Sequence, residues 1–304
     1  MSISVRDQFG KQLAQLAKDD SRVLALDGDL GNSTRLDSTE KETEDSFLQM
    51  GIAEQNMVGV AAGLASVGFQ PWVCSFATFL TKRALDQIVV SIAQTNFDVK
   101  LVGSYSGLLT SNTGKTHHSI DDIAIMTTIP NMTIIAPGDA NETVAAMKAM
   151  YKTPGPMYLR LTRDETILSF LPDVDFEIGK GKTLTEGTDI LIVTTGSTTF
   201  RVTEVIKQME DVSIAHQHFP TLKPFDKELL LEGARKVRLV VTVEEHYIRG
   251  GLGSIVSEIL SESLPKKVYR IGVPDKFLGC GTDEELLGAT GLSVEGIRNT
   301  LSAL

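Results

Sequence analysis

The sequence is poor in cysteine, with only Cys74 and Cys280 among 304 residues. Because these two lie far apart and form no closely spaced pair, the sequence indicates neither a zinc site nor a disulfide scaffold. We expect buried, reduced thiols. No apolar run approaches the roughly 20 residues that span a membrane. The N-terminal MSISVRDQFG carries charges where a signal peptide has its apolar core, so we predict a cytoplasmic protein.

Excess positive charge is also missing, since the net charge is −10. This excludes a nucleic-acid-binding or anionic-membrane surface as the main function, although a few clustered arginines can still bind a small anion. The sequence has no Walker loop and no dinucleotide fingerprint. Gly28-Asp29-Leu30, followed by Asn56, lacks the second glycine and the asparagine pair of a magnesium–diphosphate motif. We therefore predict no metal site within this chain alone.

The length suggests two domains, and apolar segments alternate with amphipathic ones along both. In the first part we expect strands at 23–26, 71–76, 99–104, 132–137 and 157–161, helices at 5–18, 54–66, 79–94 and 139–152, and a loop at 27–46. Asp139 and Glu142 have the spacing of a helix cap and its partner. This alternation predicts an α/β fold with a mostly parallel sheet and helices on both faces.

A second alternation of strands and helices follows residue 186 and predicts a smaller α/β domain. Between the two, RDETILSFLPDVDFEIGKGK has proline, glycine and charges but no long periodicity. We therefore predict domains at 1–165 and 186–304, joined by a linker at 166–185.

Glu54 is the one acid in the otherwise small and apolar segment GIAEQNMVGVAAGLASVGF at 51–69. It can be a helix-start acid stabilised by the helix dipole, and the helix alone favours that interpretation. It can also be a carboxylate fixed at a crevice for a nitrogen heterocycle. Phe76 and Phe79 follow a strand at the point where an open α/β sheet binds its ligands, which favours the second interpretation.

The polar segment SNTGKTHHSIDD at 111–122 contains the adjacent pair His117 and His118. Adjacent histidines in a loop point in different directions, so a shared metal is not indicated. One of them as a proton donor or an anion contact is consistent with the pattern.

Several segments in this order resemble the transketolase family, specifically the pyrimidine-binding domain followed by the C-terminal domain. The resemblance covers nearly the whole chain. The segments that carry it are GIAEQNMVGVAAGLASVGFQPWVCSFATF, TGKTHHSIDDIAIM, IPNMTIIAPGDANET, GPMYLRLTRDE and VEEHYIRGGLGSIV. The resemblance implies a thiamine diphosphate enzyme that transfers a two-carbon ketol unit from a ketose phosphate to an aldehyde.

The resemblance also implies roles for the residues around the cofactor. Glu54 matches the glutamate that hydrogen-bonds N1′ of the aminopyrimidine and favours its imino tautomer. Phe79 matches the aromatic residue that stacks on the pyrimidine, and Phe76 matches its neighbour in the pocket. Asp29 matches an acid near the thiazolium ring. His117 matches a histidine that contacts the reacting oxygen of the substrate.

Positions that bind the sugar phosphate in the family match Arg6, Ser33 and Arg163, and a guanidinium suits such an oxyanion. Three further substrate-contacting positions depart from the family pattern. Tyr105 replaces a histidine, Thr113 replaces an acid, and Lys115 replaces a proline. These departures leave open a substrate with another anion, such as a carboxylate, a sulfonate or a modified sugar phosphate.

The family's N-terminal domain, which binds the diphosphate through Mg²⁺, has no counterpart in this sequence. The resemblance therefore implies a split enzyme in which a partner N-terminal subunit carries that domain, in an α2β2 assembly. Gly59 and Gly63 suit a helix packed closely at a subunit interface, and a contact within the chain explains them equally well. For Glu244, Glu245 and His246 we favour a structural or interface role.

Two alternatives remain for the activity. One is a relative that uses a 2-oxo acid, such as a deoxyxylulose-phosphate synthase-like protein or the β subunit of a 2-oxo-acid dehydrogenase. The other is a non-catalytic regulatory paralogue. Retention of Glu54, Phe79 and His117 together argues against the second alternative.

Overall fold

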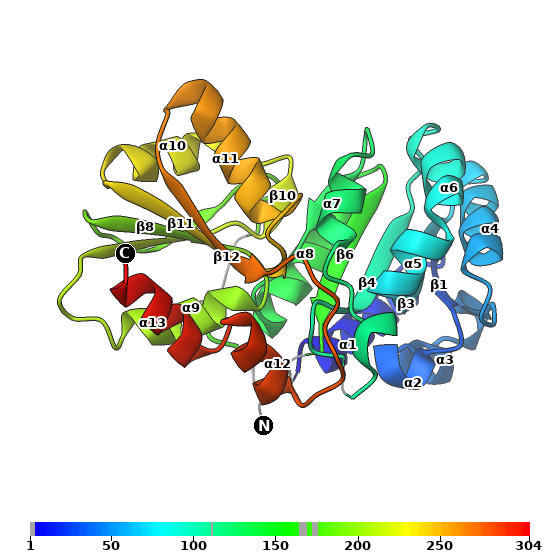
Figure 1. The fold of residues 1–304 in the computed structure, drawn as a ribbon. Helices are drawn as coiled ribbons and strands as arrows, with labels where there is room; N and C mark the ends of the chain where they lie inside the picture. Colours follow the sequence, from blue (N-terminus) through cyan, green and yellow to red (C-terminus); the bar gives the residue numbers. More distant parts are fainter. Residues whose placement is uncertain (1–3, 111, 164–168, 172–175) are drawn as a thin grey trace.

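The computed structural model describes residues 4–110, 112–163, 169–171 and 176–304. Figure 1 shows two α/β units, one from the blue-to-green part of the chain and one from the yellow-to-red part. Each unit is a sheet with helices packed against it. The predicted fold class, with mostly parallel sheets, is therefore confirmed.

Within the described residues, seven strands form the first sheet in the order β10-β5-β6-β4-β3-β1-β2. The pairs are parallel except β10 with β5. Strand β1 pairs with β2 on one side and β3 on the other, so the chain crosses β1 on its way from β2 to β3. The strands are β1 Val23–Asp27, β2 Phe47–Gln49, β3 Gln70–Phe76, β4 Lys100–Ser106, β5 Thr133–Ile135, β6 Met157–Thr162 and β10 Thr221–Lys223.

Helices cover both faces of this sheet, and the side chains of β1 alternate between them. Leu26 packs in the apolar cluster that contains Met57 of α4, whereas Ala25 packs in the cluster that contains Phe9 of α1. Burial on both faces explains why β1 is apolar until Asp27. The helices of this unit are α1 Val5–Asp19, α2 Gly31–Thr34, α3 Asp37–Glu42, α4 Glu54–Ser66, α5 Ala77–Arg83, α6 Leu85–Gln87, α7 Asp122–Thr127 and α8 Ala140–Lys152.

The second sheet has the order β12-β11-β8-β9-β7 in the described chain, and its edge strand β7 is antiparallel to β9. Its strands are β7 Lys182–Thr185, β8 Ile190–Thr194, β9 Ile214–His218, β11 Leu239–Tyr247 and β12 Val268–Val273. Its helices are α9 Thr198–Ile206, α10 Lys227–Arg235, α11 Leu252–Ser263, α12 Asp283–Thr290 and α13 Val294–Ser302.

The segment predicted as a linker at 166–185 is not irregular to its end, because its last four residues form the strand β7. Pairing of β7 with β9 satisfies backbone groups that a linker would leave to water. Residues 166–168 and 172–175 of the predicted linker lie outside the described part of the chain.

The two units share buried contacts, which the sequence did not predict. Strand β10 comes from the second half of the chain but joins the first sheet beside β5. The Glu142 Oε2 of α8 lies 2.7 Å from the His218 Nε2 of β9, and both side chains are fully buried. Asp139 caps α8 as predicted, with Oδ1 accepting from Glu142 N, while the Glu142 carboxylate accepts from Gly138 N.

Other local predictions were wrong in identifiable ways. The predicted loop 27–46 contains the short helices α2 and α3, and Asp27 accepts hydrogen bonds from Leu30 N and Gly31 N at the start of α2. The predicted helix 79–94 divides into α5, α6 and a π-helical turn over Ile88–Ala93. Cys74 is buried as expected, but Cys280 is exposed.

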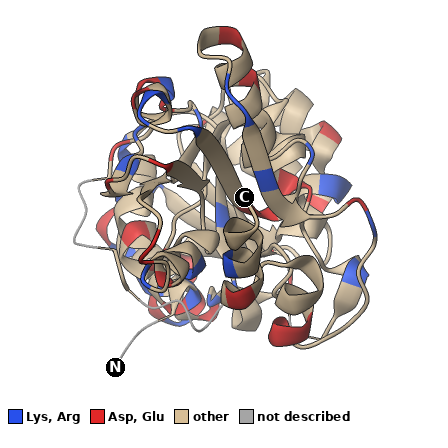
Figure 2. Ribbon diagram, turned by 60° about the vertical axis from the view of Figure 1, so that its left-hand side comes forward, with Lys and Arg blue, Asp and Glu red and all other residues tan. Residues whose placement is uncertain are grey.

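Charged residues lie mainly on helices and loops around the outside, with acids and bases interspersed in the view of Figure 2. In the described chain, no helix is both long enough and apolar enough to span a membrane.

Candidate active site

Glu54 begins α4, and its side chain is only 3% exposed. Its Oε1 accepts hydrogen bonds from Ser75 Oγ at 3.3 Å and from Arg83 Nη1 at 3.2 Å. A buried carboxylate requires such donors, because an unpaired buried charge is costly. A cavity of about 510 Å³ opens beside it and is lined by Ile52, Ala53, Glu54, Gln55, Asn56 and Arg83. The carboxylate is thus both a helix-start acid and a wall of a cavity.

Arg83 is a site residue that the sequence analysis missed. Besides pairing with Glu54, its guanidinium carbon lies 3.9 Å from the centroid of the Phe79 ring. The available signal was helical spacing, since Arg83 lies four residues after Phe79, one turn along α5. Arg83 therefore connects the carboxylate to the aromatic residue expected to stack on the pyrimidine.

Four predicted site residues form one aromatic group at the carboxyl ends of β3 and β4. The Phe76 ring stacks on Tyr105 at 4.2 Å and on Phe79 at 5.8 Å between centroids. The His117 ring meets Phe79 edge-on at 5.1 Å and Phe76 at 6.0 Å. Offset and edge-to-face contacts of this kind are favourable beyond the apolar area they bury. The structure therefore brings together residues from three separate segments of the sequence.

Tyr105 holds an unusual backbone conformation, with φ of 55°. Positive φ is uncommon for a residue other than glycine and costs of order 1 kcal/mol. The pairing of β4 with β6 shifts register between Gly103 and Ser106, as at a β-bulge. Bulges near binding sites re-aim a side chain, and this one directs Tyr105 onto Phe76 and toward two arginines.

Arg6 and Arg163 lie at Tyr105, and Arg6 also connects Tyr105 to Ser33. Arg6 Nη1 donates to the Tyr105 hydroxyl at 3.0 Å and to the Ser33 carbonyl at 3.1 Å. The guanidinium carbons of Arg6 and Arg163 each lie 5.4 Å from the Tyr105 ring centroid. Two guanidinium groups at one aromatic ring form a positive site that suits a phosphate or another oxyanion.

His117 packs against both phenylalanines of the aromatic group. Its Nδ1 lies 2.9 Å from Thr116 Oγ1. Burial lowers the pKa of His117, and the positive charge of Arg83 lowers it further. A neutral imidazole near pH 7 can both accept and donate a proton, as the predicted contact with a substrate oxygen requires.

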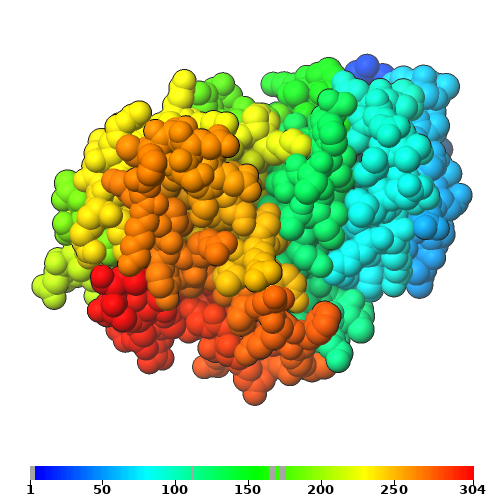
Figure 3. All heavy atoms as spheres, turned by 45° about the horizontal axis from the view of Figure 1, so that its top comes forward, coloured from blue at the N-terminus to red at the C-terminus, as the bar shows by residue number. Residues whose placement is uncertain are grey.

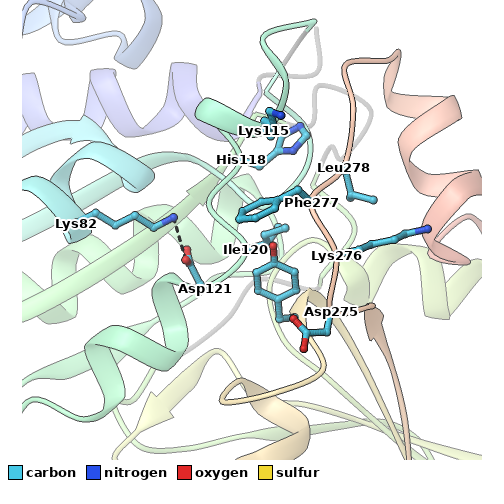
Figure 4. A pocket seen from close by; sticks show the side chains of 10 residues that line it. Lys82, Lys115, His118, Ile120, Asp121, Asp275, Lys276, Phe277 and Leu278 are labelled. Atoms are coloured by element: carbon cyan, nitrogen blue, oxygen red, sulfur yellow. Dashed lines mark ion pairs between the residues drawn. The ribbon is translucent and has the colours of Figure 1, made fainter.

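Lys115 and Thr113 do not join this group through any contact among the described residues. Thr113 Oγ1 bonds Thr110 within the loop. Lys115 lines a second cavity of about 340 Å³, which Figure 4 shows between the segment with Lys115 and His118 and the segment that follows β12. In this cavity Lys82 pairs with Asp121, and the amine of Lys276 points away from the ring of Phe277.

Asp29 lies apart from Glu54 and lines a cavity of about 350 Å³ together with Ser33. Its backbone has φ of 65°, and its N–H donates to Gln49 Oε1. The neighbouring Asp27, which the sequence analysis did not select, is fully buried and anchors this turn. Burial raises the pKa of Asp27.

In the described part of the chain, no group of three or more His, Cys, Asp or Glu side chains is arranged to hold a metal ion. Gly59 and Gly63 face open space on α4 within this chain, so no contact between its described residues accounts for them.

Comparison with known proteins identifies the family of the chain. Two family models match, "Transketolase, pyrimidine binding domain" over residues 1–167 and "Transketolase, C-terminal domain" over residues 179–297. The putative transketolase C-terminal section of Methanocaldococcus jannaschii is 38% identical over 299 residues, covering 96% of this chain and 93% of the relative. One of the subunits of the apulose-4-phosphate transketolase of Phocaeicola vulgatus is 37% identical over 306 residues, with 98% and 96% covered.

Among solved structures, a split gene transketolase described as an inactive β4 tetramer superimposes with a TM-score of 0.88. It is 37% identical, and the match covers 100% of this chain and 98% of that one. The chain also matches deoxyxylulose-phosphate synthases, such as that of Syntrophotalea carbinolica at 38% identity, but it spans only 46% of that protein. The prediction of a transketolase-like transferase is thus confirmed, and the 2-oxo-acid relatives remain the alternative.

Transketolases depend on thiamine diphosphate, and this chain carries their pyrimidine-binding domain. The chain belongs to the transketolase family and corresponds to its pyrimidine-binding and C-terminal domains.

Proposed function

We propose that this chain is the C-terminal subunit of a split, thiamine diphosphate-dependent transketolase that transfers a two-carbon ketol unit from an anionic ketose to an aldehyde. The observation that carries the proposal is the continuous row of contacts from Glu54 through Arg83, Phe79 and Phe76 to Tyr105 and its two arginines, with His117 packed against both phenylalanine rings. Cofactor recognition and anion recognition lie at the two ends of this row.

The residues present suit the aminopyrimidine half of the cofactor. Glu54 is a buried acceptor beside a cavity, and Phe79 presents an aromatic face next to it. In this assignment Glu54 accepts a hydrogen bond from the protonated ring nitrogen and holds that proton in place. When bound, the cofactor supplies the nucleophilic carbon that carries the two-carbon unit.

His117 and the arginines act on the substrate in this assignment. His117, kept neutral by burial and Arg83, exchanges a proton with a substrate oxygen. Arg6 and Arg163 hold the anionic end, which fixes the reacting carbonyl relative to His117. The rings of Phe76, Phe79 and Tyr105 form an apolar wall that limits the access of water to the reacting atoms.

The remaining groups of the active site are assigned to a partner. We place the diphosphate and Mg²⁺ in an N-terminal transketolase subunit, with an α2β2 assembly and the cofactor between subunits. The names of the two split relatives support this division. We also place the protein in the cytoplasm, since a free, exposed Cys280 suits a reducing compartment.

The substrate departs from an ordinary pentose phosphate in this proposal, because Tyr105 takes a position that a histidine holds in the family. The Tyr105 hydroxyl accepts a hydrogen bond from Arg6, so Tyr105 adds a polar group to the proposed anion site. Lys115 lies in the second cavity, so its contact is with another part of the substrate or with the partner.

The test is an assay of the chain co-expressed with its N-terminal partner, using ketoses that end in phosphate, sulfonate or carboxylate. Ketol transfer from one of these supports the proposal. Turnover of pyruvate without ketol transfer would establish the 2-oxo-acid alternative. The Glu54→Gln variant is the control for background, since it keeps side-chain volume but removes the negative charge.

A further inference from the structure

The loop that carries His117 is held by a strand of the other unit. We define the His117 loop as residues 107–110 and 112–120. Glu245, on β11 of the second unit, accepts a hydrogen bond at Oε1 from Leu108 N at 2.8 Å. The contact is so close that a Cβ on Gly107 would clash with the same oxygen. Gly107 also has φ of 87°, so this position requires glycine on two counts.

Glu245 is itself fixed within the second unit. Its Oε2 accepts hydrogen bonds from Ser197 Oγ at 2.9 Å and from Arg201 Nη2 at 2.5 Å. The side chains of Glu245 and Arg201 are 1% and 6% exposed. A buried, charge-assisted pair keeps one geometry, so the acceptor offered to Leu108 is rigid.

The far end of the loop is held by the same stretch of β11. Arg160 Nη2 donates to the Glu245 carbonyl at 2.9 Å and to the Ser119 carbonyl at 3.3 Å. Tyr247 N donates to the Ile120 carbonyl at 2.7 Å. Gly107 and Ser119 exchange backbone hydrogen bonds of 2.8 and 3.1 Å, which close the base of the loop.

The tip of the loop is exposed and is held within the loop by bonds such as that of Thr113 Oγ1 to the Thr110 carbonyl. Asn112, Thr113, Lys115 and Thr116 are exposed. The segment after β12 contacts the tip, since Cys280 Sγ lies where a Cβ on Gly114 would clash with it. Figure 3 shows this orange-red segment of the second unit against the green part of the first unit. The position of His117 therefore rests on its ring contacts with Phe76 and Phe79 and on how the base of the loop is held.

We propose that Glu245 is a positioning residue for the reaction, through which the C-terminal unit fixes His117 against the aromatic group and the bound substrate. The proposal rests on the proposed function for its kinetic consequence, but its structural part concerns the His117 loop alone. Glu245 would thus contribute to catalysis by positioning His117, without contacting the substrate itself.

The neighbouring acid supplies a matched comparison. Glu244 is also fully buried, but adjacent side chains of a strand point to opposite faces. Its Oε1 accepts from Gly253 N at 2.9 Å, at the start of α11 within its own unit. Of the two acids, Glu245 is the one whose side chain bonds the His117 loop.

The experiment compares two double variants in the complete complex with the N-terminal subunit. Glu245→Gln/Arg201→Met removes the buried charge pair but keeps a side-chain carbonyl that can accept from Leu108 N. Glu245→Leu/Arg201→Met removes the same charges and the acceptor together. Both lose the ion pair, so the difference between them isolates the hydrogen bond to the loop. Glu244→Gln controls for a change to a buried acid nearby.

Amide exchange of peptides from the His117 loop is measured first, because it requires no turnover. We expect at least about tenfold faster exchange in the leucine variant than in the glutamine variant, with α10 and β12 unchanged. With an active substrate, we expect at least about a tenfold lower kcat in the leucine variant, at an equal dissociation constant for thiamine diphosphate. Equal amide-exchange rates of the His117 loop in the two double variants would overturn the proposal. Faster exchange in the leucine variant with an unchanged kcat would also overturn it.

Failure of the proposed function would appear differently, as absence of ketol transfer in the unmodified complex. In that case the exchange comparison still decides whether Glu245 holds the loop. If either double variant fails to fold, Ser197→Ala replaces it, since this change removes one of the two donors that orient Glu245. Loop exchange indistinguishable from that of the unmodified complex would then contradict the proposal.

Discussion

Replacing Arg83 by methionine is expected to destabilise the chain through Glu54. Methionine keeps much of the volume that packs on Phe79 but removes the guanidinium. Glu54, at 3% exposure, is then left with Ser75 Oγ at 3.3 Å as its one remaining side-chain donor among the contacts described. The loss of stability therefore comes from a buried carboxylate left without its charged partner, not from losing the arginine side chain itself.

The magnitude lies between two limits. Breaking a fully buried pair costs about 3–5 kcal/mol, and an exposed pair is worth about 0–1 kcal/mol. Here Glu54 is buried but the Arg83 side chain is 47% exposed, so water screens one partner. We therefore expect a loss of about 2 kcal/mol, or a fall in melting temperature of roughly 4 °C for a chain of this size.

The assay is a double-mutant cycle of Glu54→Gln, Arg83→Met and the double variant, followed by thermal or urea unfolding. A glutamine in place of the carboxylate has no charge to leave unpaired, so the double variant should recover about 1–2 kcal/mol relative to the sum of the single changes. Additivity within about 0.3 kcal/mol would show that the two side chains do not interact, and the reasoning would be refuted.

Further predictions concern activity, cofactor binding and pH. Glu54→Gln in the reconstituted complex should lower kcat at least about 100-fold while the complex still assembles; full activity would exclude the catalytic role. The isolated chain should bind thiamine diphosphate with Mg²⁺ weakly by calorimetry, and tight binding would contradict the split site. Tyr105→Phe, which removes the hydroxyl that Arg6 bonds, should raise KM for the anionic ketose several-fold with little change in kcat. Burial raises the pKa of Glu244 from an ordinary 4.5 to about 7, so the native state binds more protons than the unfolded state between these values. Stability should therefore fall by up to about 3 kcal/mol from about pH 4.5 to above pH 7. Unfolding curves of Glu244→Gln should lack this fall, and a fall that persists in the variant would contradict the assignment to Glu244.

The regular elements could be predicted because their patterns are local. Strand β1 and helix α8 follow from apolar periodicity and from the cap at Asp139, and both lie close to their predicted bounds. Strand β10 could not be predicted, because it is three residues long and its partner β5 lies far away in the sequence. Strand β7 was missed for the same reason, since its residues alternate in burial only after β9 is in place.

The site was predictable to the extent that its chemistry lies in short segments. Glu54, Phe79 and His117 belong to recognisable segments, whereas the contact between Tyr105 and Phe76 depends on a bulge that no residue pattern announces. Arg83 was visible only through its helical spacing from Phe79, and the sequence did not show that Lys115 lines a separate cavity. The residues that could not be predicted are those whose position depends on side-chain direction, which tertiary packing sets.

The same reasoning explains why the pair Glu244-Glu245 looked only structural in the sequence. A buried acid on a strand normally serves its own fold, and Glu244 does so by bonding the start of α11. Glu245, one residue later, points to the opposite face of β11, where it meets Leu108 N of the other unit's loop. Because the loop bearing His117 begins and ends against this strand, a change in the packing of the second unit alters the geometry of the first. Separating the two units should therefore reduce catalysis even where every residue that contacts the substrate is retained.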